Sequence, residues 1–368
     1  MNEERMRVLE MVRDGKISAE EGARLLEALQ PKKNGPPPSA TDHFDDPVGR
    51  LASAVAEALQ TGNWRGLAGS FVGSWTGGPL TGLERRRQRE AEGWQFLTFS
   101  EGDHGTFDLP ADARLVVEHE AGSIESIAGD GPARLELEGE GTHDFSIYVA
   151  RKEQEVLLAA HRTAPFARMP RLKLSVPRHV AHVSLRTAGG SLTADGFACP
   201  VSLKTAGGSI RVSDHRADAV EAKTAGGGIK VDGTPSRLDL KTSGGSIRFE
   251  GRTESFNVKT SGGSIHLSGV HLTSGEHSAK TSGGSVRIEL SRDSSVEVTA
   301  KTSAGKINAD LPGAEGEHSG SRFSPSYRGR YNGGSAQLHV ATSAGSVSIG
   351  LAEESNPSSD SGHTEAAA

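Results

Sequence analysis

One seven-residue phrase recurs eight times between residues 186 and 348, and this repeat constrains the fold more than any other feature of the sequence. Its copies read RTAGGSL, KTAGGSI, KTAGGGI, KTSGGSI, KTSGGSI, KTSGGSV, KTSAGKI and ATSAGSV. Their threonines are spaced by 18, 19, 18, 18, 21, 21 and 40 residues and are Thr187, Thr205, Thr224, Thr242, Thr260, Thr281, Thr302 and Thr342. Periods near 20 residues are typical of repeat architectures, in which each unit packs on its neighbours.

Each copy reads as two short strands joined at a glycine corner. Before the corner, Leu238, Leu240 and Thr242 alternate with charged residues and share one face of a strand. After the corner, Ile247 and Phe249 alternate with polar residues in the same way. We expect the paired glycines to supply positive φ where the chain reverses.

The repeat predicts a mainly all-β fold, a β-solenoid or β-helix-like stack of two-strand rungs. A single rung cannot bury its apolar face alone, so stacking must create a continuous core. The fifth residue after each threonine is always Leu, Ile or Val, as expected if equivalent positions lie over one another. An antiparallel meander of hairpins would show the same alternation, so the parallel solenoid and the meander both remain open.

The composition fits a thin, extended core. Only 34% of the 368 residues are hydrophobic and 5% aromatic, whereas 47 are glycine. The single cysteine, Cys199, excludes an intramolecular disulfide and fits a reducing compartment. The N-terminus lacks the apolar core of a signal peptide, and no run of 18 apolar residues is present. We therefore expect a cytoplasmic protein, with the periphery of the inner membrane as the alternative location.

We predict four segments along the chain. Residues 1–30 form a helical hairpin, with a capping box that begins at Ser18. Residues 31–93 form a linker that contains a short amphipathic helix and a Trp/Arg-rich segment. Residues 94–351 form the β-repeat domain, and residues 352–368 a polar, disordered tail. The hairpin is too short to be stable alone, so we expect it to bind a protein partner or a second copy.

The run LKLSVPRHVAHVSLRTAGGSL, followed by serial KT-[AS]-GGS-I units, resembles the bacterial putative-adhesin β-strand repeat family of unknown function. The opening helical pair resembles the SHOCT-like hairpin. The resemblance implies a β-helix-like fold and a link, in some members, to cell-envelope stress. It implies no catalytic residues.

Two columns of cations flank the glycine corner in the repeat. If the rungs stack, these columns become ladders that could hold a polyanion such as an anionic glycan, or a membrane surface. The competing interpretation is that neighbouring acids, Glu221 and Asp239 among them, neutralise the ladders as surface ion pairs. The predicted anion- or partner-binding residues are Lys204, Lys223, Lys241, Lys259, Lys280, Arg211, Arg248 and Arg287.

The sequence carries no recognisable catalytic, cofactor-binding or metal-binding pattern. The histidines lack metal-ligand spacing. No aromatic residues for base stacking are interleaved with the cations on the outward face of the repeats, which argues against nucleic acid. The irregular segment 313–335 is interpreted as a mobile or binding loop. We predict a non-catalytic scaffold or interaction protein of the cell envelope or of adhesion. The alternatives are a glycan- or polyanion-binding module and, less favoured, a β-helix polysaccharide-active enzyme.

Overall fold

The computed structural model describes residues 82–97, 104–139, 145–162, 170–321 and 324–352. The chain divides into two units, Met1–Asp46 and Pro47–Ala368, and every described residue belongs to the second. The predicted hairpin, the amphipathic helix of the linker and the tail beyond Ala352 lie outside the described residues.

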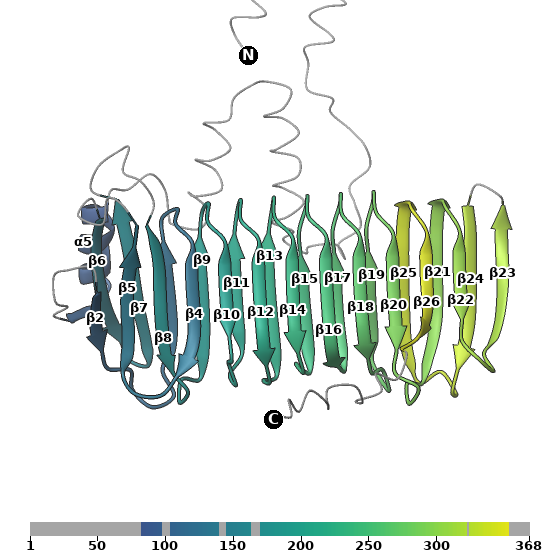
Figure 1. Ribbon diagram of the computed structural model, residues 1–368, viewed down its shortest axis with the longest axis horizontal. Coiled ribbons are helices and arrows are strands. Elements are labelled where there is room, and N and C mark those ends of the chain that lie inside the picture. The colour runs from purple at the N-terminus through teal and green to yellow at the C-terminus, as the bar shows by residue number, and fades with distance from the viewer. Residues whose placement is uncertain (1–81, 98–103, 140–144, 163–169, 322–323, 353–368) are drawn as a thin grey trace, which may run out of the picture. The chain divides into compact units, whose positions relative to one another are not determined.

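The described residues form two long sheets and a short helix, α5 (Gly82–Ala91), as Figure 1 shows. Sheet A comprises, in spatial order, β1 (Gln95–Leu97), β6 (Phe145–Lys152), β7 (Glu155–Arg162), β3 (Arg114–His119), β9 (His182–Thr187), β11 (Val201–Thr205), β13 (Ala219–Thr224), β15 (Arg237–Lys241), β17 (Ser255–Lys259), β19 (Glu276–Lys280), β25 (Ala336–Ala344), β21 (Val296–Ala304), β24 (Ser324–Tyr331) and β23 (Glu315–Ser321).

Sheet B comprises, in spatial order, β2 (His104–Phe107), β5 (Ala133–Glu138), β8 (Arg171–Pro177), β4 (Ile124–Gly129), β10 (Leu192–Asp195), β12 (Ile210–His215), β14 (Ile229–Gly233), β16 (Ile247–Thr253), β18 (Ile265–Val270), β20 (Val286–Leu290), β26 (Val347–Leu351) and β22 (Ile307–Asp310). Each rung contributes one strand to each sheet. Inward side chains of both sheets, such as Leu240 and Phe249, fill one continuous core.

The parallel solenoid is confirmed and the meander is wrong for the repeats. Thr205 pairs in register with Thr187 on one side and Thr224 on the other, and the following rungs pair in parallel in the same way. Among the described strands, antiparallel pairs occur only towards the two ends of the sheets, at β1–β6–β7, β2–β5–β8 and β21–β24–β23. The threonines therefore form one buried column, as the alternation predicted.

Each threonine hydroxyl ties its rung to the preceding one. Thr242 Oγ1 donates a hydrogen bond of 2.7 Å to the carbonyl of Gly227, and the Gly245 amide donates to the same hydroxyl at 3.3 Å. The other threonines make the same inter-rung bond at 2.8–2.9 Å, to Gly122, Gly190, Gly208, Gly245, Gly263, Gly284 and Gly345. We call this contact the Thr–Gly clasp. It satisfies a buried hydroxyl and a corner carbonyl together.

The expected reason for the corner glycines is wrong. Neither Gly244 nor Gly245 has a positive φ, and the same holds at the other Thr-[AS]-Gly-Gly corners. Instead, a Cβ at Gly245 would lie less than 3.0 Å from the carbonyl oxygen of Gly227 in the preceding rung. Positive φ occurs at the opposite corner, for example at Gly233 and Gly251. The second glycine is thus required by the close approach of stacked rungs.

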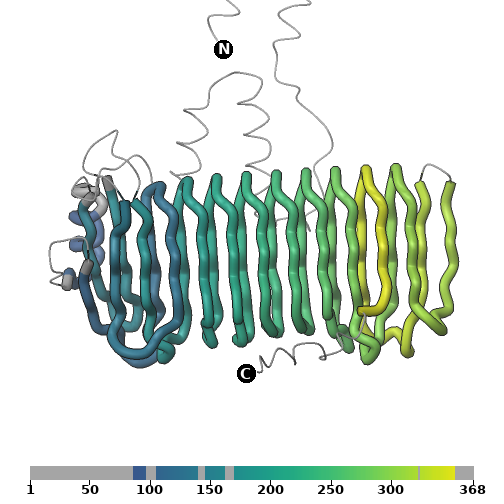
Figure 2. The backbone as a smooth tube through the Cα atoms, viewed as in Figure 1, coloured from purple at the N-terminus to yellow at the C-terminus, as the bar shows by residue number. Residues whose placement is uncertain are grey.

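The order of the rungs departs from the order of the sequence near the C-terminus. The rung β25–β26 lies between β19–β20 and β21–β22, and in Figure 2 this yellow rung stands between two green ones. The clasps follow the same order, because Thr342 donates to Gly284 and Thr302 to Gly345. The spacing of 40 residues thus contains the β23–β24 hairpin. The interpretation of 313–335 as a loop is wrong, since its Tyr327 and Tyr331 are buried.

A histidine takes the place of threonine in the first clasp. His119 pairs in register with Thr187, and its Nδ1 accepts a hydrogen bond from the Gly122 amide. Its Nε2 must therefore carry the proton and donate to the carbonyl of Pro170. Burial is the main reason why the pKa of His119 falls from 6.5 to about 4. The neutral ring is the form that the clasp requires.

We expect Gly245→Ala to lower the free energy of unfolding by about 1–3 kcal/mol, because the new Cβ overlaps the Gly227 carbonyl. The matched control is Gly244→Ala, whose Cβ would lie 3.1 Å from the Gly226 oxygen and whose equivalent position holds Ala304 in another rung. Urea unfolding followed by circular dichroism measures both. Equal losses for the two variants would contradict the close-approach explanation.

His119 should make the stability of the protein sensitive to acid. The unfolded ring takes up a proton at pH 6.5 and the folded ring only near pH 4, so stability is full above pH 6.5 and falls as the pH drops towards 4. The loss attributable to His119 is about 3 kcal/mol. His119→Thr, which restores the residue of the other rungs, should flatten this decline in unfolding experiments from pH 7 to 4. An unchanged slope would show that His119 is not responsible.

Candidate binding surfaces on the outer faces of the sheets

The predicted cations do form two ladders, but the ladders lie on different faces. On sheet A, Lys204, Lys223, Lys241, Lys259 and Lys280 pair in register along the parallel strands. On sheet B the in-register column is Arg211, Lys230, Arg248, His266 and Arg287. Outward side chains of two sheets that share a core point in opposite directions. The two predicted ladders therefore form two separate surfaces and cannot hold one ligand between them across the corner.

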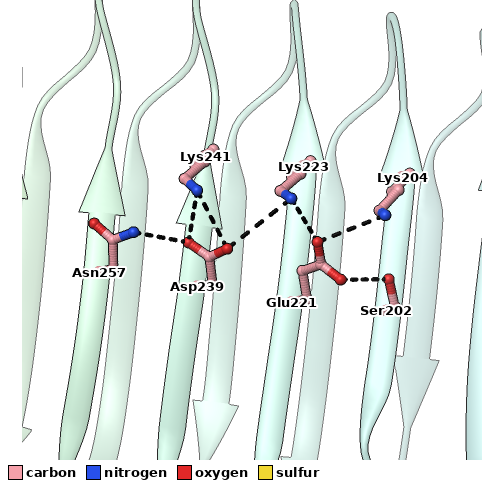
Figure 3. A network of polar contacts seen from close by, with 7 residues as sticks. All are labelled: Ser202, Lys204, Glu221, Lys223, Asp239, Lys241 and Asn257. Carbon is pink, nitrogen blue, oxygen red and sulfur yellow. Dashed lines mark hydrogen bonds and ion pairs between the residues drawn. The ribbon is translucent and has the colours of Figure 1, made fainter. Parts of the chain in front are cut away.

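Most of the ladder on sheet A is neutralised by acids from the adjacent column. Figure 3 shows Glu221 between Lys204 and Lys223, and Asp239 between Lys223 and Lys241. The nitrogen–oxygen distances are 3.5 Å for Lys204–Glu221 and 3.2 Å for Lys241–Asp239. This arrangement is the ion-pair alternative that the sequence left open. Three of the predicted cations, Lys204, Lys223 and Lys241, are engaged in these ion pairs.

The electrostatics of Glu221 follow from this network. Partial burial opposes ionisation of Glu221, but the hydrogen bond from Lys223 and the charges of Lys204 and Lys223 outweigh it. The Ser202 hydroxyl donates a further hydrogen bond of 2.9 Å to the carboxylate. Together these contacts lower the pKa of Glu221 to about 2. A carboxylate held ionised in this way is unsuited to act as a general acid.

The ladder on sheet B is only partly neutralised. Lys230 lies 3.5 Å from Asp232 and 3.8 Å from Glu250, and Arg248 lies 3.6 Å from Glu250. Arg211 and Arg287 are exposed and form no ion pair within the part of the chain that the structure describes. These two unpaired arginines lie on sheet B, whereas the network of Figure 3 lies on sheet A.

The ladder on sheet A is also interrupted. The inserted strand β25 places Ala341 between Lys280 and Lys301, where every neighbouring repeat strand carries Lys or Arg. The sequence shows Ala341 as the first letter of ATSAGSV. It does not show that Ala341 lies between Lys280 and Lys301, because the inserted rung is out of sequence order.

The arginine-rich end of the predicted Trp/Arg-rich segment forms α5 and lies at the opposite end of sheet A, whereas its Trp64 and Trp75 fall outside the described residues. Arg89 of α5 donates a hydrogen bond of 2.8 Å to Glu118 and lies over the ring of Trp94, 5.6 Å from its centre. Trp94 and Phe96 pack against an outer apolar cluster that includes Tyr148. These side chains therefore cover part of the solenoid surface.

The described residues offer no reactive thiol, metal site or membrane-spanning helix. Burial raises the pKa of the Cys199 thiol to about 11, so the thiolate is scarce at neutral pH. Within the described ranges, no group of three or more His, Cys, Asp or Glu is placed to hold a metal ion. No helix in these ranges has the length and hydrophobicity that a membrane span requires.

Three solved structures resemble this chain at low sequence identity. A putative cell adhesion protein from Clostridium sporogenes is 9% identical with a TM-score of 0.26, and the match covers 67% of this chain and 97% of that one. A putative adhesin from Bacteroides fragilis is 13% identical with a TM-score of 0.41, covering 69% and 99%. A putative adhesin from Parabacteroides distasonis is 12% identical with a TM-score of 0.38, covering 67% and 98%. No curated protein matches the chain.

Two family models match the sequence. Residues 3–34 match a SHOCT-like domain, which confirms the resemblance of the opening segment. Residues 132–350, more than half of the chain, match the Toastrack DUF4097 model, and these residues include all eight copies of the repeat. Together with the stacked two-strand rungs, this match shows that the chain belongs to the Toastrack DUF4097 family.

Proposed function

We propose that this protein is a non-catalytic scaffold that binds its ligand through the outer faces of a rigid solenoid, in adhesion or at the cell envelope. The observation that carries the proposal is the Thr–Gly clasp, repeated from rung to rung. The clasp uses the threonine hydroxyls, and the core uses the inward apolar side chains. The outward side chains are what remains for binding.

The outer faces support binding better than catalysis. Hydrolysis of a polysaccharide needs a carboxylic acid that is protonated near neutral pH beside a second carboxylate. Glu221 has the opposite property, since its cationic neighbours keep it ionised. Adhesion is the role that the resemblance of the repeats to the adhesin family implies, and the SHOCT-like segment would serve as the docking element for a protein partner or a second copy.

Binding and turnover can be followed in one experiment. The full-length protein is immobilised and exposed to polysaccharides extracted from the native cell envelope, while reducing ends and unsaturated products are measured in the eluate. We expect saturable binding and no product. Product formation that grows with time would replace the scaffold by an enzyme, and the absence of binding to any envelope fraction would reject a ligand-binding role for these faces.

A second candidate function, binding of a polyanionic glycan, is favoured by the cations that lack acidic partners. Arg211 and Arg287 on sheet B, and Lys280 on sheet A, are exposed and form no ion pair among the described residues. Lys204, Lys223 and Lys241 are instead held by Glu221 and Asp239. The polyanion would thus contact different residues from those at the centre of the predicted ladder.

Releasing the paired lysines should strengthen polyanion binding. We expect Glu221→Gln combined with Asp239→Asn to elute from a heparin column at higher salt than wild type, because three lysines lose their acidic partners. The control combines Glu254→Gln with Asp218→Asn, two exposed acids that form no ion pair in the described chain, and changes the net charge equally. Identical elution of the two variants would mean that only net charge matters.

A further inference from the structure

The interruption at Ala341 creates a surface unlike the rest of sheet A. Lys280 of β19 and Lys301 of β21 each pair in register with Ala341 of β25, which lies between them. The two lysines are therefore two strand spacings apart, about 10 Å. A methyl group stands where the regular ladder would place a third long side chain, so the lysine side chains border a gap.

The corner sequence extends this surface. In the rungs with Thr-Ser-Gly-Gly the strand ends at the lysine, as β19 does at Lys280. In the two Thr-Ser-Ala-Gly rungs, β21 and β25 run on to Ala304 and Ala344. Side-chain alternation then places Ser303 and Ser343, both exposed, on the same face as Lys301 and Ala341. Two hydroxyls thus lie beside the gap on its corner side.

On the other side of the gap, the three strands that border it carry no carboxylate in the adjacent row. Ser278, His339 and Thr299 pair in register there, in the same column that holds Glu221 and Asp239 farther along the sheet. Arg328 of β24 pairs with Thr299 and is exposed, and Glu317 of β23 pairs with Arg328 on its far side. The gap is therefore bordered by cations, hydroxyls and an imidazole.

The acids closest to this surface lie one row farther from the corner. They are Glu276 and Glu297, and Glu297 pairs in register with Arg330. Neither acid forms an ion pair with Lys280 or Lys301 among the described residues. The positive charge on both sides of Ala341 is thus uncompensated, in contrast to the network of Figure 3.

We propose that the Ala341 gap is an anion-binding site for a sulfate or phosphate ester carried by a glycan. Lys280 and Lys301 contact the anionic group from its two sides, and Ser303, Ser343 and His339 offer hydrogen bonds to it or to the adjoining sugar. The inference rests on the proposed function, because it assumes that the outer face of sheet A binds a ligand. It adds the place and the chemistry of that ligand.

A glycan fits the site better than a membrane or a nucleic acid does. The surface around Ala341 is polar, and the large hydrophobic side chain that is exposed in the described residues, Ile127, belongs to sheet B. Insertion into a bilayer would require apolar side chains here, and single-stranded nucleic acid would require aromatic ones. Hydroxyl rows next to cations instead match a polyhydroxylated, anionic polymer.

The site is tested with the full-length protein and heparin as the probe, by calorimetry at 50 mM salt. Lys280→Gln combined with Lys301→Gln should weaken heparin binding about tenfold, because two charge-assisted contacts are lost. Ala341→Leu fills the gap without any change of charge and should weaken heparin binding by a similar factor. The matched control, Lys204→Gln with Lys241→Gln, removes two charges from the same ladder where acids already neutralise them and should change binding less than twofold.

Each other outcome has a defined meaning. The proposed site would be overturned if the control and the Lys280/Lys301 variant lost heparin affinity equally and Ala341→Leu kept the wild-type affinity. Heparin would then be held only by non-specific electrostatic attraction. Tighter binding to phosphatidylglycerol vesicles than to heparin, lost in the Lys280/Lys301 variant, would replace the glycan by a lipid headgroup. Wild-type protein that binds envelope polysaccharide but not heparin overturns the anionic site alone, whereas binding to neither also rejects the proposed function.

Discussion

The fold depends on one contact, the hydrogen bond from a buried threonine hydroxyl to the corner carbonyl of the preceding rung. It forms only if the corners approach so closely that the second glycine has no room for a side chain. The same close approach sets the register of both sheets, because each corner fixes the start of the strand that follows it. His119 shows that the requirement is for a donor and an acceptor at this position, since its neutral ring meets both needs.

The surface chemistry is a consequence of this stacking. Because rungs stack in register, each outward position becomes a column, and the pairing between adjacent columns decides whether a charge is available. Where Glu221 and Asp239 stand beside the lysines, the surface neutralises itself. Where the repeat departs from its pattern, at Ala341 and at the Thr-Ser-Ala-Gly corners, the cations have no such partner. On sheet A, the departures from the repeat are therefore more informative about binding than the central rungs.

The sequence predicted the rung but not the whole stack. The alternation at Leu238, Leu240 and Thr242 correctly assigned the buried face, because periodicity of two is a local property. The role of the glycines was misjudged, since a close approach depends on the neighbouring rung and not on the turn alone. The insertion of β25–β26 could not be predicted from the spacing of the threonines. The 40 residues between Thr302 and Thr342 do not indicate which rungs the last copy stacks against. The sequence also did not predict that the two cationic ladders lie on opposite sheets. Their residues are close in sequence, but the corner between them turns the chain from one sheet to the other.

Distances between labelled rungs test the stacking most directly. In protein with Cys199→Ala, spin labels are attached to cysteines at position 209 paired with either 346 or 306, and the distances are measured by pulsed electron paramagnetic resonance. Stacking with an inserted rung places Ser346 five rungs and Lys306 six rungs from Ser209, about 24 Å and about 29 Å apart. A shorter distance to position 306 than to 346 would contradict the insertion, and distances unrelated to rung number would contradict the stack itself.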